Sequence, residues 1–399
     1  MNKQMGVIAL LLMTIFIGFG IIIPVMPLAV LGTGTGESNQ YHNFMLLSVY
    51  SLSSFLMSPI WGSLSDRIGR RPLILIGLLG YAASFLLFGI GIEHLWMMYI
   101  SRILGGLFSG AATACAVAYV ADITTAENRT KGMGVVGMSI GLGFIFGPAI
   151  GGLLGEVSLQ LPFFASSVLV VVTFLFAFLV LKESLPVEKR RKASSASSQK
   201  VSRWTAFQGS LKYLYILSFF VTFTLAGLEG TMQYFQMEKI GATPGDIGKM
   251  FLVSGIVGAV IQGGVIRKLV KPGTEQRVIV IGLLLSALGF VLILFSTNVW
   301  TAAAFLAVFG AGNALIRPCV TSLLTQKTTV DQGVTTGLNS SMDSLGRILG
   351  PLIGGALFTL NSSLPYIAGA ILCLGAIYLV ARFMIADRNA SNSLNNQLS

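Results

Sequence analysis

The chain has 399 residues, of which 54% are hydrophobic and only 10% are charged, and its mean hydropathy is +0.81. Soluble globular proteins carry about 25% charged residues, so this composition excludes that class and places the chain in a lipid bilayer. The formal net charge of +11 at pH 7 fits either a polyanionic partner or the orientation signal of a membrane protein, and the positions of the basic residues decide between them.

Twelve segments reach the length of about 20 predominantly apolar residues that a transmembrane helix needs. They span residues 6–31, 42–64, 73–92, 95–122, 131–155, 161–182, 211–236, 245–270, 276–297, 299–325, 334–361 and 363–385. The first segment has no small-residue cleavage site after it and contains Pro24 and Pro27, which favours a retained helix over a signal peptide. We therefore predict an all-α membrane protein with twelve transmembrane helices.

The basic residues lie almost entirely on one side of the predicted membrane. With the N-terminus in the cytoplasm, Lys239 and Lys249 fall outside the cell. Arg102, Arg317 and Arg347 fall within helices, and every other Lys and Arg falls on the cytoplasmic side. This distribution follows the positive-inside rule. It predicts that both termini are cytoplasmic. The net positive charge then orients the chain in the membrane, next to membrane lipid, and does not imply a nucleic-acid partner.

Residues 62–72, between the second and third segments, read Gly-Ser-Leu-Ser-Asp-Arg-Ile-Gly-Arg-Arg-Pro. The glycines permit a tight hairpin, and Asp66 can accept a hydrogen bond from an arginine or a helix N-terminus. Arg67 and Arg70 can reach acidic lipid or a neighbouring helix. Near the inner end of the fourth segment, Asp122 is the expected partner of this loop. We predict that these four charged residues form a gate.

The fifth and eleventh segments contain nearly the same sequence. Residues 143–152 read Gly-Phe-Ile-Phe-Gly-Pro-Ala-Ile-Gly-Gly, and residues 346–355 read Gly-Arg-Ile-Leu-Gly-Pro-Leu-Ile-Gly-Gly. A half-chain repeat in a membrane protein is typical of a transporter built from two similar bundles. Glycines three or four apart allow close helix packing, and proline bends a helix. We predict packing against the opposite bundle, and hinge bending, at Gly143, Gly147, Pro148, Gly151, Gly350 and Pro351.

The clearest break in the chain follows the sixth segment. Residues 183–210 combine a basic run with a serine-rich stretch, which favours a solvated tether, with binding to anionic lipid headgroups as the alternative. We therefore predict two pseudo-symmetric six-helix bundles, at 1–182 and 211–388, joined by a cytoplasmic linker at 183–210. A disordered tail is expected at 389–399.

Ionisable side chains inside apolar segments cost about 2.5 to 3.5 kcal/mol each on insertion scales, so each one indicates a functional site. Glu229 lies in the middle of the seventh segment with no basic residue within a turn of it. Burial favours the uncharged form of an isolated carboxyl, so Glu229 can bind a proton and, when ionised, attract a cationic drug. The alternative is a glutamate that a neighbouring helix satisfies without further function.

Asp343 and Arg347 are four residues apart in the eleventh segment, which places them on one helix face where they can pair. Such a pair is either structurally neutralised or a proton-switched couple. Arg102, in the fourth segment, has no acid one turn away. It either serves transport or extends its charged group to the membrane interface.

Aromatic and methionine side chains tolerate ligands of many shapes and attract cations. Those on helices expected to border a central cavity are Phe16, Phe19, Tyr50, Phe144, Tyr234, Phe235, Met138 and Met232. Each of them is equally compatible with a core or lipid-facing position. Cys115, Cys319 and Cys373 lack the spacing of a metal or redox site, and no phosphate-binding loop occurs in the sequence. We expect buried free thiols, no metal or other cofactor, and a protein that is not an enzyme.

Residues 62–72 resemble the signature loop of the major facilitator superfamily. Residues 18–27 (Gly-Phe-Gly-Ile-Ile-Ile-Pro-Val-Met-Pro), residues 102–112 and residues 143–152 are similar to motifs of its drug:proton antiporters. The resemblance covers essentially the whole chain. With Ile316-Arg317-Pro318 in the tenth segment, it is closest to multidrug exporters of the NorA and Bmr type.

This resemblance implies the two-bundle major facilitator fold and the proton-coupled export of lipophilic, often cationic or zwitterionic drugs across the bacterial cytoplasmic membrane by alternating access. It implies a coupling role for Glu229, a cavity-lining and proton-transfer role for Arg102, and a place for Arg317 near the coupling site. The related exporters carry an acid three residues before the Arg-Pro pair, where this chain has Ala314. A monomer is expected.

Two other classes of protein remain, a dedicated transporter of tetracycline or of a metabolite, and a non-transporting receptor or scaffold. A dedicated tetracycline exporter is suggested by the similarity of residues 155–158 and 162–164 to that group, but the acid that those exporters carry in helix 1 is replaced here by Ile15. A metabolite transporter of the same superfamily is disfavoured by the antiporter-type motif at 143–152. A non-transporting receptor or scaffold is disfavoured by the intact loop and by the cost of the buried charges.

Overall fold

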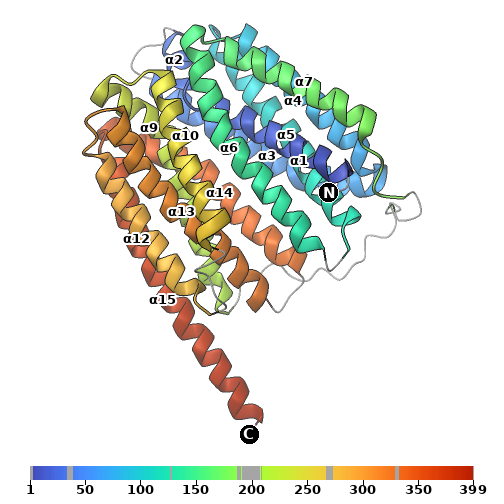
Figure 1. Ribbon diagram of the computed structural model, residues 1–399, viewed down its shortest axis with the longest axis vertical. Coiled ribbons are helices and arrows are strands. Elements are labelled where there is room, and N and C mark those ends of the chain that lie inside the picture. The colour runs from blue at the N-terminus through green and yellow to red at the C-terminus, as the bar shows by residue number, and fades with distance from the viewer. Residues whose placement is uncertain are drawn as a thin grey trace. The chain divides into compact units, whose positions relative to one another are not determined.

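The computed structural model describes residues 3–33, 39–125, 128–186, 190, 207, 209–266, 273–328 and 332–398. All regular structure in these ranges is helical (Figure 1). The helices of the first half are α1 (Lys3–Ile21), α2 (Met26–Leu31), α3 (Asn39–Ile68), α4 (Arg70–Ile90), α5 (Leu95–Ile123), α6 (Arg129–Val157) and α7 (Leu161–Val180). Those of the second half are α9 (Leu211–Ile240), α10 (Pro244–Val260), a π-helical turn (Ile261–Val265), α12 (Glu275–Ile293), α13 (Val299–Lys327), α14 (Gln332–Leu360) and α15 (Leu364–Leu398). A helix satisfies its own backbone donors and acceptors, which a bilayer cannot do.

Among the described residues, 11 helices are long and apolar enough to cross a membrane. The twelfth long helix, α14, has 29 residues and therefore a length of about 43 Å, enough to span the hydrocarbon core. It is less apolar than the others because it carries Asp343, Arg347 and several Ser, Thr and Asn residues. The prediction of an all-α membrane protein is confirmed.

The helix predicted at 6–31 is divided into α1 and α2. Proline lacks the backbone N–H that a helix interior requires and disfavours helical conformation in the residue before it. Pro24 therefore falls in the break after Ile21, and Pro27 lies in the first turn of α2, where its missing N–H costs nothing.

The described chain divides into two compact units. Unit 1 contains Met1–Ser198 and Gln236–Gly255, and unit 2 contains Gln199–Phe235 and Ile256–Ser399. The hairpin between α9 and α10 thus groups with the first half of the chain, because Gly152 on α6 lies against the backbone of Gly248 on α10. Thr243 Oγ1 also donates a hydrogen bond of 3.1 Å to Glu156 Oε1. Most of the linker predicted at 183–210 lies outside the described residues, so that division of the chain stays a prediction.

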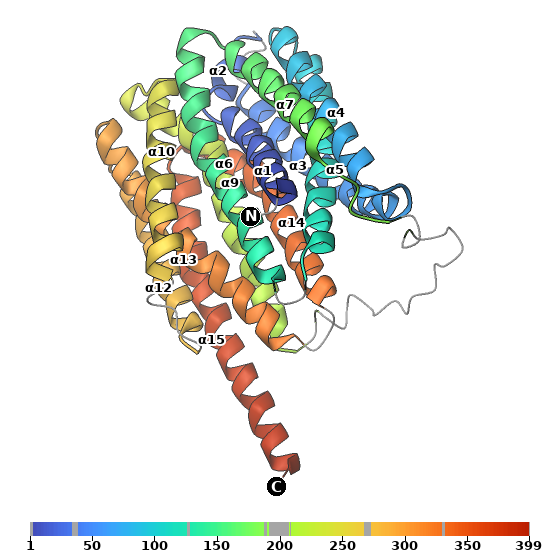
Figure 2. The same ribbon diagram turned by 45° about the vertical axis from the view of Figure 1, so that its right-hand side comes forward.

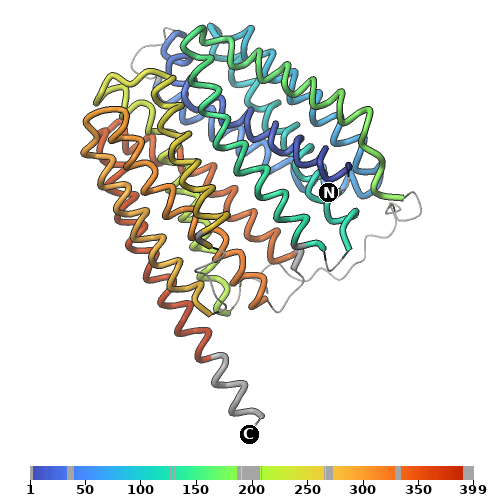
Figure 3. The backbone as a smooth tube through the Cα atoms, viewed as in Figure 1, coloured from blue at the N-terminus to red at the C-terminus, as the bar shows by residue number. Residues whose placement is uncertain are grey.

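Each unit has its own aromatic core. In unit 1, α1 packs against α6, and α4 packs against α5 and α7 (Figure 2). The rings of Phe88 and Phe163 stack there at a centroid distance of 4.2 Å. In unit 2, α12 packs against α13 and α15, as the orange and red segments of the backbone trace show (Figure 3). Phe290 and Phe309 meet there edge to face at 4.8 Å.

The last helix is longer than the sequence predicts. α15 runs from Leu364 to Leu398, past the predicted span of 363–385, and the disordered tail expected at 389–399 from its Asn- and Ser-rich composition stays a prediction. Residues 386–398 contain neither Gly nor Pro, so nothing in the sequence ends the helix at Arg388. Cys115, Cys319 and Cys373 are buried free thiols, as predicted.

Candidate functional site

A charge cluster holds the turn between α3 and α4. Gly69 has a φ of 117°, which favours glycine, and it alone separates the two helices. Arg70 Nη1 lies 2.7 Å from Asp66 Oδ1, and Arg70 Nε donates to Asp122 Oδ2 at 3.1 Å. Arg67 is exposed. The structure therefore brings together three of the four residues predicted to form a gate.

Glu183 completes this cluster, although its position in the sequence assigns it to the linker. Its Oε1 accepts the backbone N–H of Arg70 at 2.8 Å, and its Oε2 accepts that of Arg71 at 3.2 Å. A carboxylate at this place satisfies the free N–H groups at the start of α4 and complements the helix dipole. A Cβ atom on Gly69 would collide with the same carboxylate. The only sequence signal is an acid that directly follows an apolar segment.

Glu229, in α9, pairs with an arginine from another helix. Its Oε2 lies 3.4 Å from Arg347 Nη1 of α14, and only 11% of the Glu229 side chain is exposed. The expectation of an isolated carboxyl is therefore wrong, because the sequence reveals only the neighbours on the same helix. Protonation of Glu229 removes its negative charge and with it the attraction that holds Arg347. The pair is thus a contact that a proton can make or break.

Asp343 has partners on two other helices. Its Oδ2 lies 3.4 Å from Arg317 Nη2 of α13, and its Oδ1 accepts a hydrogen bond of 2.8 Å from Thr222 Oγ1 of α9. In place of the pair predicted within α14, the structure has two pairs that join α14 to α9 and to α13. Buried charges are costly unless paired, and the packed helices bring opposite charges closer than the spacing along one helix does.

Arg102, on α5, is enclosed by aromatic rings. Its side chain is 1% exposed, and within the described ranges its Nε and Nη2 have no hydrogen-bond partner. Its Cζ lies 4.8 Å from the ring centroid of Phe88 and 5.7 Å from those of Tyr50 and Phe85. Cation–π contacts of this kind stabilise a desolvated guanidinium. In this structure Arg102 neither lines an open cavity nor extends to an interface.

Four of the predicted aromatic residues form a cluster in unit 1. The ring of Phe144 on α6 lies 5.3 Å from that of Phe16 and 5.6 Å from that of Phe19, both on α1. Phe19 in turn lies 5.4 Å from Tyr50 of α3, which also contacts Arg102. The other predicted members are not alike: Met232, Tyr234 and Phe235 are buried, whereas Met138 is 57% exposed.

The glycine repeat in α6 packs against α1. A Cβ atom on Gly147 would lie 2.7 Å from the carbonyl oxygen of Ile17, and Gly143 and Gly151 face α1 in the same way. Only glycine permits this approach of the two backbones. Pro148 lies inside α6, at the bend position that the sequence predicts.

The repeat in α14 packs in the same way against α9. A Cβ atom on Gly350 would lie 2.5 Å from the carbonyl oxygen of Phe223, and Pro351 follows inside the helix. The prediction that Gly147 and Gly350 face the opposite bundle is wrong, since they contact α1 and α9 of their own halves of the chain, whereas Gly152 at the end of the first repeat lies against α10 of the second half. Positions four residues apart form one stripe on a helix, and a stripe of small residues packs against a single neighbour.

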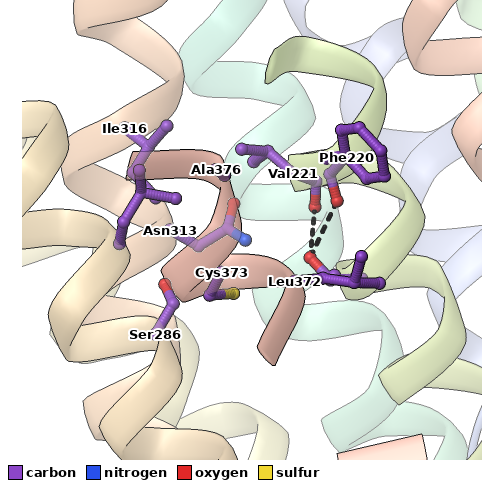
Figure 4. A pocket seen from close by; sticks show the side chains of 10 residues that line it. Phe220, Val221, Ser286, Asn313, Ile316, Leu372, Cys373 and Ala376 are labelled. Carbon is purple, nitrogen blue, oxygen red and sulfur yellow. Dashed lines mark hydrogen bonds between the residues drawn. The ribbon is translucent and has the colours of Figure 1, made fainter. Parts of the chain in front are cut away.

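A small cavity lies inside unit 2, between α9, α12, α13 and α15 (Figure 4). Ser286, Asn313 and Cys373 supply polar atoms to its lining, and Ser286 Oγ has no partner in the described part of the chain. The centre of a water molecule can reach a volume of about 10 Å³ in this cavity. That is room for about one water molecule, whereas drug-sized ligands occupy pockets of about 300–1,000 Å³. This cavity is therefore not the drug site.

Comparison with known sequences gives consistent matches along the chain. The model of the Major Facilitator Superfamily matches residues 8–277 and 273–397. Multidrug resistance protein 2 of Bacillus subtilis is 36% identical over 383 residues, which is 94% of each chain. Quinolone resistance protein NorA of Staphylococcus aureus is 29% identical over 388 residues, which is 95% of this chain and 96% of the relative.

Solved structures share the fold. The human organic anion transporter MFSD10 (TETRAN) superposes with a TM-score of 0.73 at 24% identity, over 95% of this chain and 99% of the other. A bacterial homolog of the human lysosomal transporter Spinster, in an inward-facing and occupied conformation, superposes with a TM-score of 0.67 at 13% identity, over 96% of each chain.

Proposed function

The chain belongs to the Major Facilitator Superfamily, and from this premise we propose that it exports lipophilic, often cationic or zwitterionic drugs in exchange for protons. The observation that carries the proposal is the Glu229–Arg347 pair, an acid and a base that meet across two helices with little exposure. The names of the relatives, a multidrug and a quinolone resistance protein, support drugs as the cargo.

In the proposed cycle, Glu229 either binds a proton or, when it is ionised, attracts a cationic drug. The ionised carboxylate attracts a cation, and the protonated carboxyl does not, so the two ligands compete. Competition of this kind couples the entry of a proton to the release of a drug. The membrane potential contributes about 2.3 kcal/mol per charge per 100 mV to the driving force.

The aromatic cluster of Phe16, Phe19, Tyr50 and Phe144 is the proposed contact surface for the drug. Flat rings bind many planar ligands, and their faces attract cations. A site of this kind is broad, because ring stacking demands less directional matching than hydrogen bonds do. We place the protein in the bacterial cytoplasmic membrane as a monomer with both termini in the cytoplasm.

Alternating access completes the proposal. Gly143, Gly147, Pro148, Gly151, Gly350 and Pro351 are the proposed hinge positions, and the Asp66–Arg70–Asp122 cluster is the proposed gate. Proline within a helix removes one backbone hydrogen bond and makes bending easier there. An ion-pair cluster at a turn can open and close as a unit when the helices that carry it move.

A proteoliposome assay tests this function. The purified protein is reconstituted, a pH gradient is imposed, and the movement of ethidium, a lipophilic cation, is followed by fluorescence with and without a proton uncoupler. Uphill movement that the uncoupler abolishes, for ethidium and for several unrelated dyes, is the expected result. Transport that is unaffected by the gradient, or restricted to one compound, would contradict the proposal.

A further inference from the structure

A row of polar contacts follows the packed helices α9 and α14. Ser218 Oγ donates to Asn339 Oδ1 at 2.6 Å, and Thr222 Oγ1 donates to Asp343 Oδ1 at 2.8 Å. Arg347 Nη1 then meets Glu229 Oε2 at 3.4 Å. We name these six residues the polar seam; three come from each helix, and all lie within unit 2.

The spacing of the polar seam is regular on α14, whereas on α9 Thr222 follows Ser218 by four residues and Glu229 follows Thr222 by seven. Positions 339, 343 and 347 of α14 are each four residues apart, which puts them on one face at steps of about 6 Å along the axis. One bridging water spans such a step with two hydrogen bonds of about 2.8 Å, whereas the seven residues from Thr222 to Glu229 on α9, about 10 Å along the axis, take a short chain of waters. Residue numbers rise together on both helices, so the two run parallel. The seam therefore leads from Glu229 to the end of the unit where α9 and α14 begin.

Helix packing does not require these polar groups. The equivalent pair α1 and α6 uses the same glycine stripe, and there the stripe meets Met13, Ile17 and Ile21 of α1. In α9, Ser218 and Thr222 are 7% and 1% exposed, so their hydroxyl groups are withdrawn from solvent. Buried polar groups are costly unless they are hydrogen-bonded, and an apolar seam would avoid that cost. The polar contacts between α9 and α14 therefore point to a use.

We propose that the polar seam is the route by which a proton passes between Glu229 and the end of the unit where α9 and α14 begin, with Asp343 as the intermediate acceptor. The inference rests on the proposed function, since it takes Glu229 as the proton-binding acid. Under the proposed orientation, this end faces the cytoplasm. Asp343 then supplies the second carboxylate that the chain lacks at Ala314.

Each transfer in this route conserves protons. The Glu229 carboxyl gives its proton to the first of a short chain of bridging waters, and the last water passes one of its own protons to Asp343. Asp343 releases that proton to a second water, which the lone pairs of Ser218 can hold because the Ser218 hydrogen is directed at Asn339. Arginine does not lose its proton in proteins, so Arg347 and Arg317 act by balancing the carboxylates that remain.

The charged groups that face each acid support this order. Glu229 faces Arg347 of α14 and, at longer range, Arg317 of α13. Asp343 faces Arg317 at 3.4 Å, and Arg347 follows it by four residues on the same helix face. One arginine on the shared face thus lies between the two acids, where it can pair with whichever carboxylate is ionised. Thr222 is a positioning residue, because its hydroxyl fixes one oxygen of Asp343.

The test compares two threonines of α9. Thr222→Val keeps the shape of the side chain and removes the hydroxyl that positions Asp343. We expect gradient-driven ethidium export to fall about 10-fold in kcat, with KM unchanged and with an altered pH profile. Thr224→Val is the matched control, because the Thr224 hydroxyl donates to carbonyl groups of its own helix and interacts with Cys373 of α15, which lies outside the polar seam, so this variant should leave both constants unchanged. Thr222→Ser, which restores a hydroxyl, should recover most of the rate.

Asp343→Asn and Glu229→Gln separate this route from the function as a whole. We expect Asp343→Asn to lose coupled export while the protein still binds ethidium in detergent. If Glu229→Gln abolishes coupling but Asp343→Asn and Thr222→Val keep the wild-type rate and pH profile, the route is wrong and the proposed function stands. If the wild-type protein ignores the pH gradient, both are wrong. Equal losses in Thr222→Val and Thr222→Ser would also overturn the route, since they would indicate a packing effect.

Discussion

The α1–α6 pair of unit 1 and the α9–α14 pair of unit 2 each pack through the same kind of glycine stripe, but the side chains beside the stripe differ. In both pairs, the stripe brings two helix backbones into direct contact. Beside the stripe, α1 contributes apolar and aromatic side chains such as Ile17 and Phe16, whereas α9 contributes Thr222 and Glu229. The repeat therefore determines how closely the helices pack and leaves each copy free to carry its own chemistry.

The two units therefore have different proposed roles, drug contact in unit 1 and proton binding in unit 2. The aromatic cluster around Phe144 belongs to unit 1, and the acids Glu229 and Asp343 belong to unit 2. In unit 1, the buried arginine of α5, Arg102, is surrounded by aromatic rings. Four predictions test how far this contrast extends.

The largest effect is expected at Glu229, the proton-binding acid of the polar seam. Glu229→Gln removes the ionisable group and keeps the size of the side chain, so uphill export should fall at least about 100-fold, the loss of an essential proton-transfer group. The protein should remain folded and bind drug. Glu238→Gln, at an exposed position on the same helix, is the control and should export normally. Reconstituted transport under a pH gradient measures both, and wild-type export by Glu229→Gln would remove this acid from the mechanism.

A charge exchange tests whether the second pair is defined by the two charges or by their order. Arg317→Asp alone leaves two acids facing each other, and we expect export and membrane abundance to fall about 10-fold, because like charges at this distance repel. Adding Asp343→Arg restores an opposite pair and should recover abundance. Export should remain low, because the relay has lost its acid at position 343. Recovery of both properties would mean that the pair is structural.

The glycine stripe itself should respond equally in both units. Gly147→Val and Gly350→Val each place a side chain against a facing carbonyl oxygen, and turnover should fall about 10-fold while drug binding changes less than about twofold. Gly137→Val and Gly337→Val, at positions of the same helices with open space around them, serve as controls. Transport rates and binding titrations measure the two quantities. Normal turnover in Gly147→Val would reduce the stripe to a packing contact without a hinge.

The smallest effect is expected at the aromatic cluster. Phe144→Leu keeps apolar volume and removes one ring, so the apparent affinity for planar cations should fall about three- to fivefold, the value of a ring contact of about 1 kcal/mol. Phe146→Leu, on an exposed position of α6, is the control. Dose–response curves for a planar and a non-planar drug measure the change. An equal loss for both drugs would mean that Phe144 acts through packing and not through stacking.

The charge clusters show where sequence analysis stops. The loop at 62–72 led directly to the Asp66–Arg70–Asp122 cluster, since a hairpin confines its own residues and the helix ends beside it. Glu183 escaped that analysis because its partners, the N–H groups at the start of α4, lie 112 and 113 residues away along the chain. The same limit explains the error at Glu229, whose partner Arg347 lies 118 residues further on.

The sequence by itself determined the membrane class, the long helices, the glycine repeat and the positions of the charged residues. Hydropathy, proline breaks and residue spacing are local properties, which a single chain displays without its fold. Only the tertiary structure decided which faces meet: each repeat against a helix of its own unit, Glu229 against Arg347, and Asp343 against Arg317 and Thr222. Those contacts depend on the packing of helices that are remote in sequence, and a buried charge takes the partner that packing brings nearest.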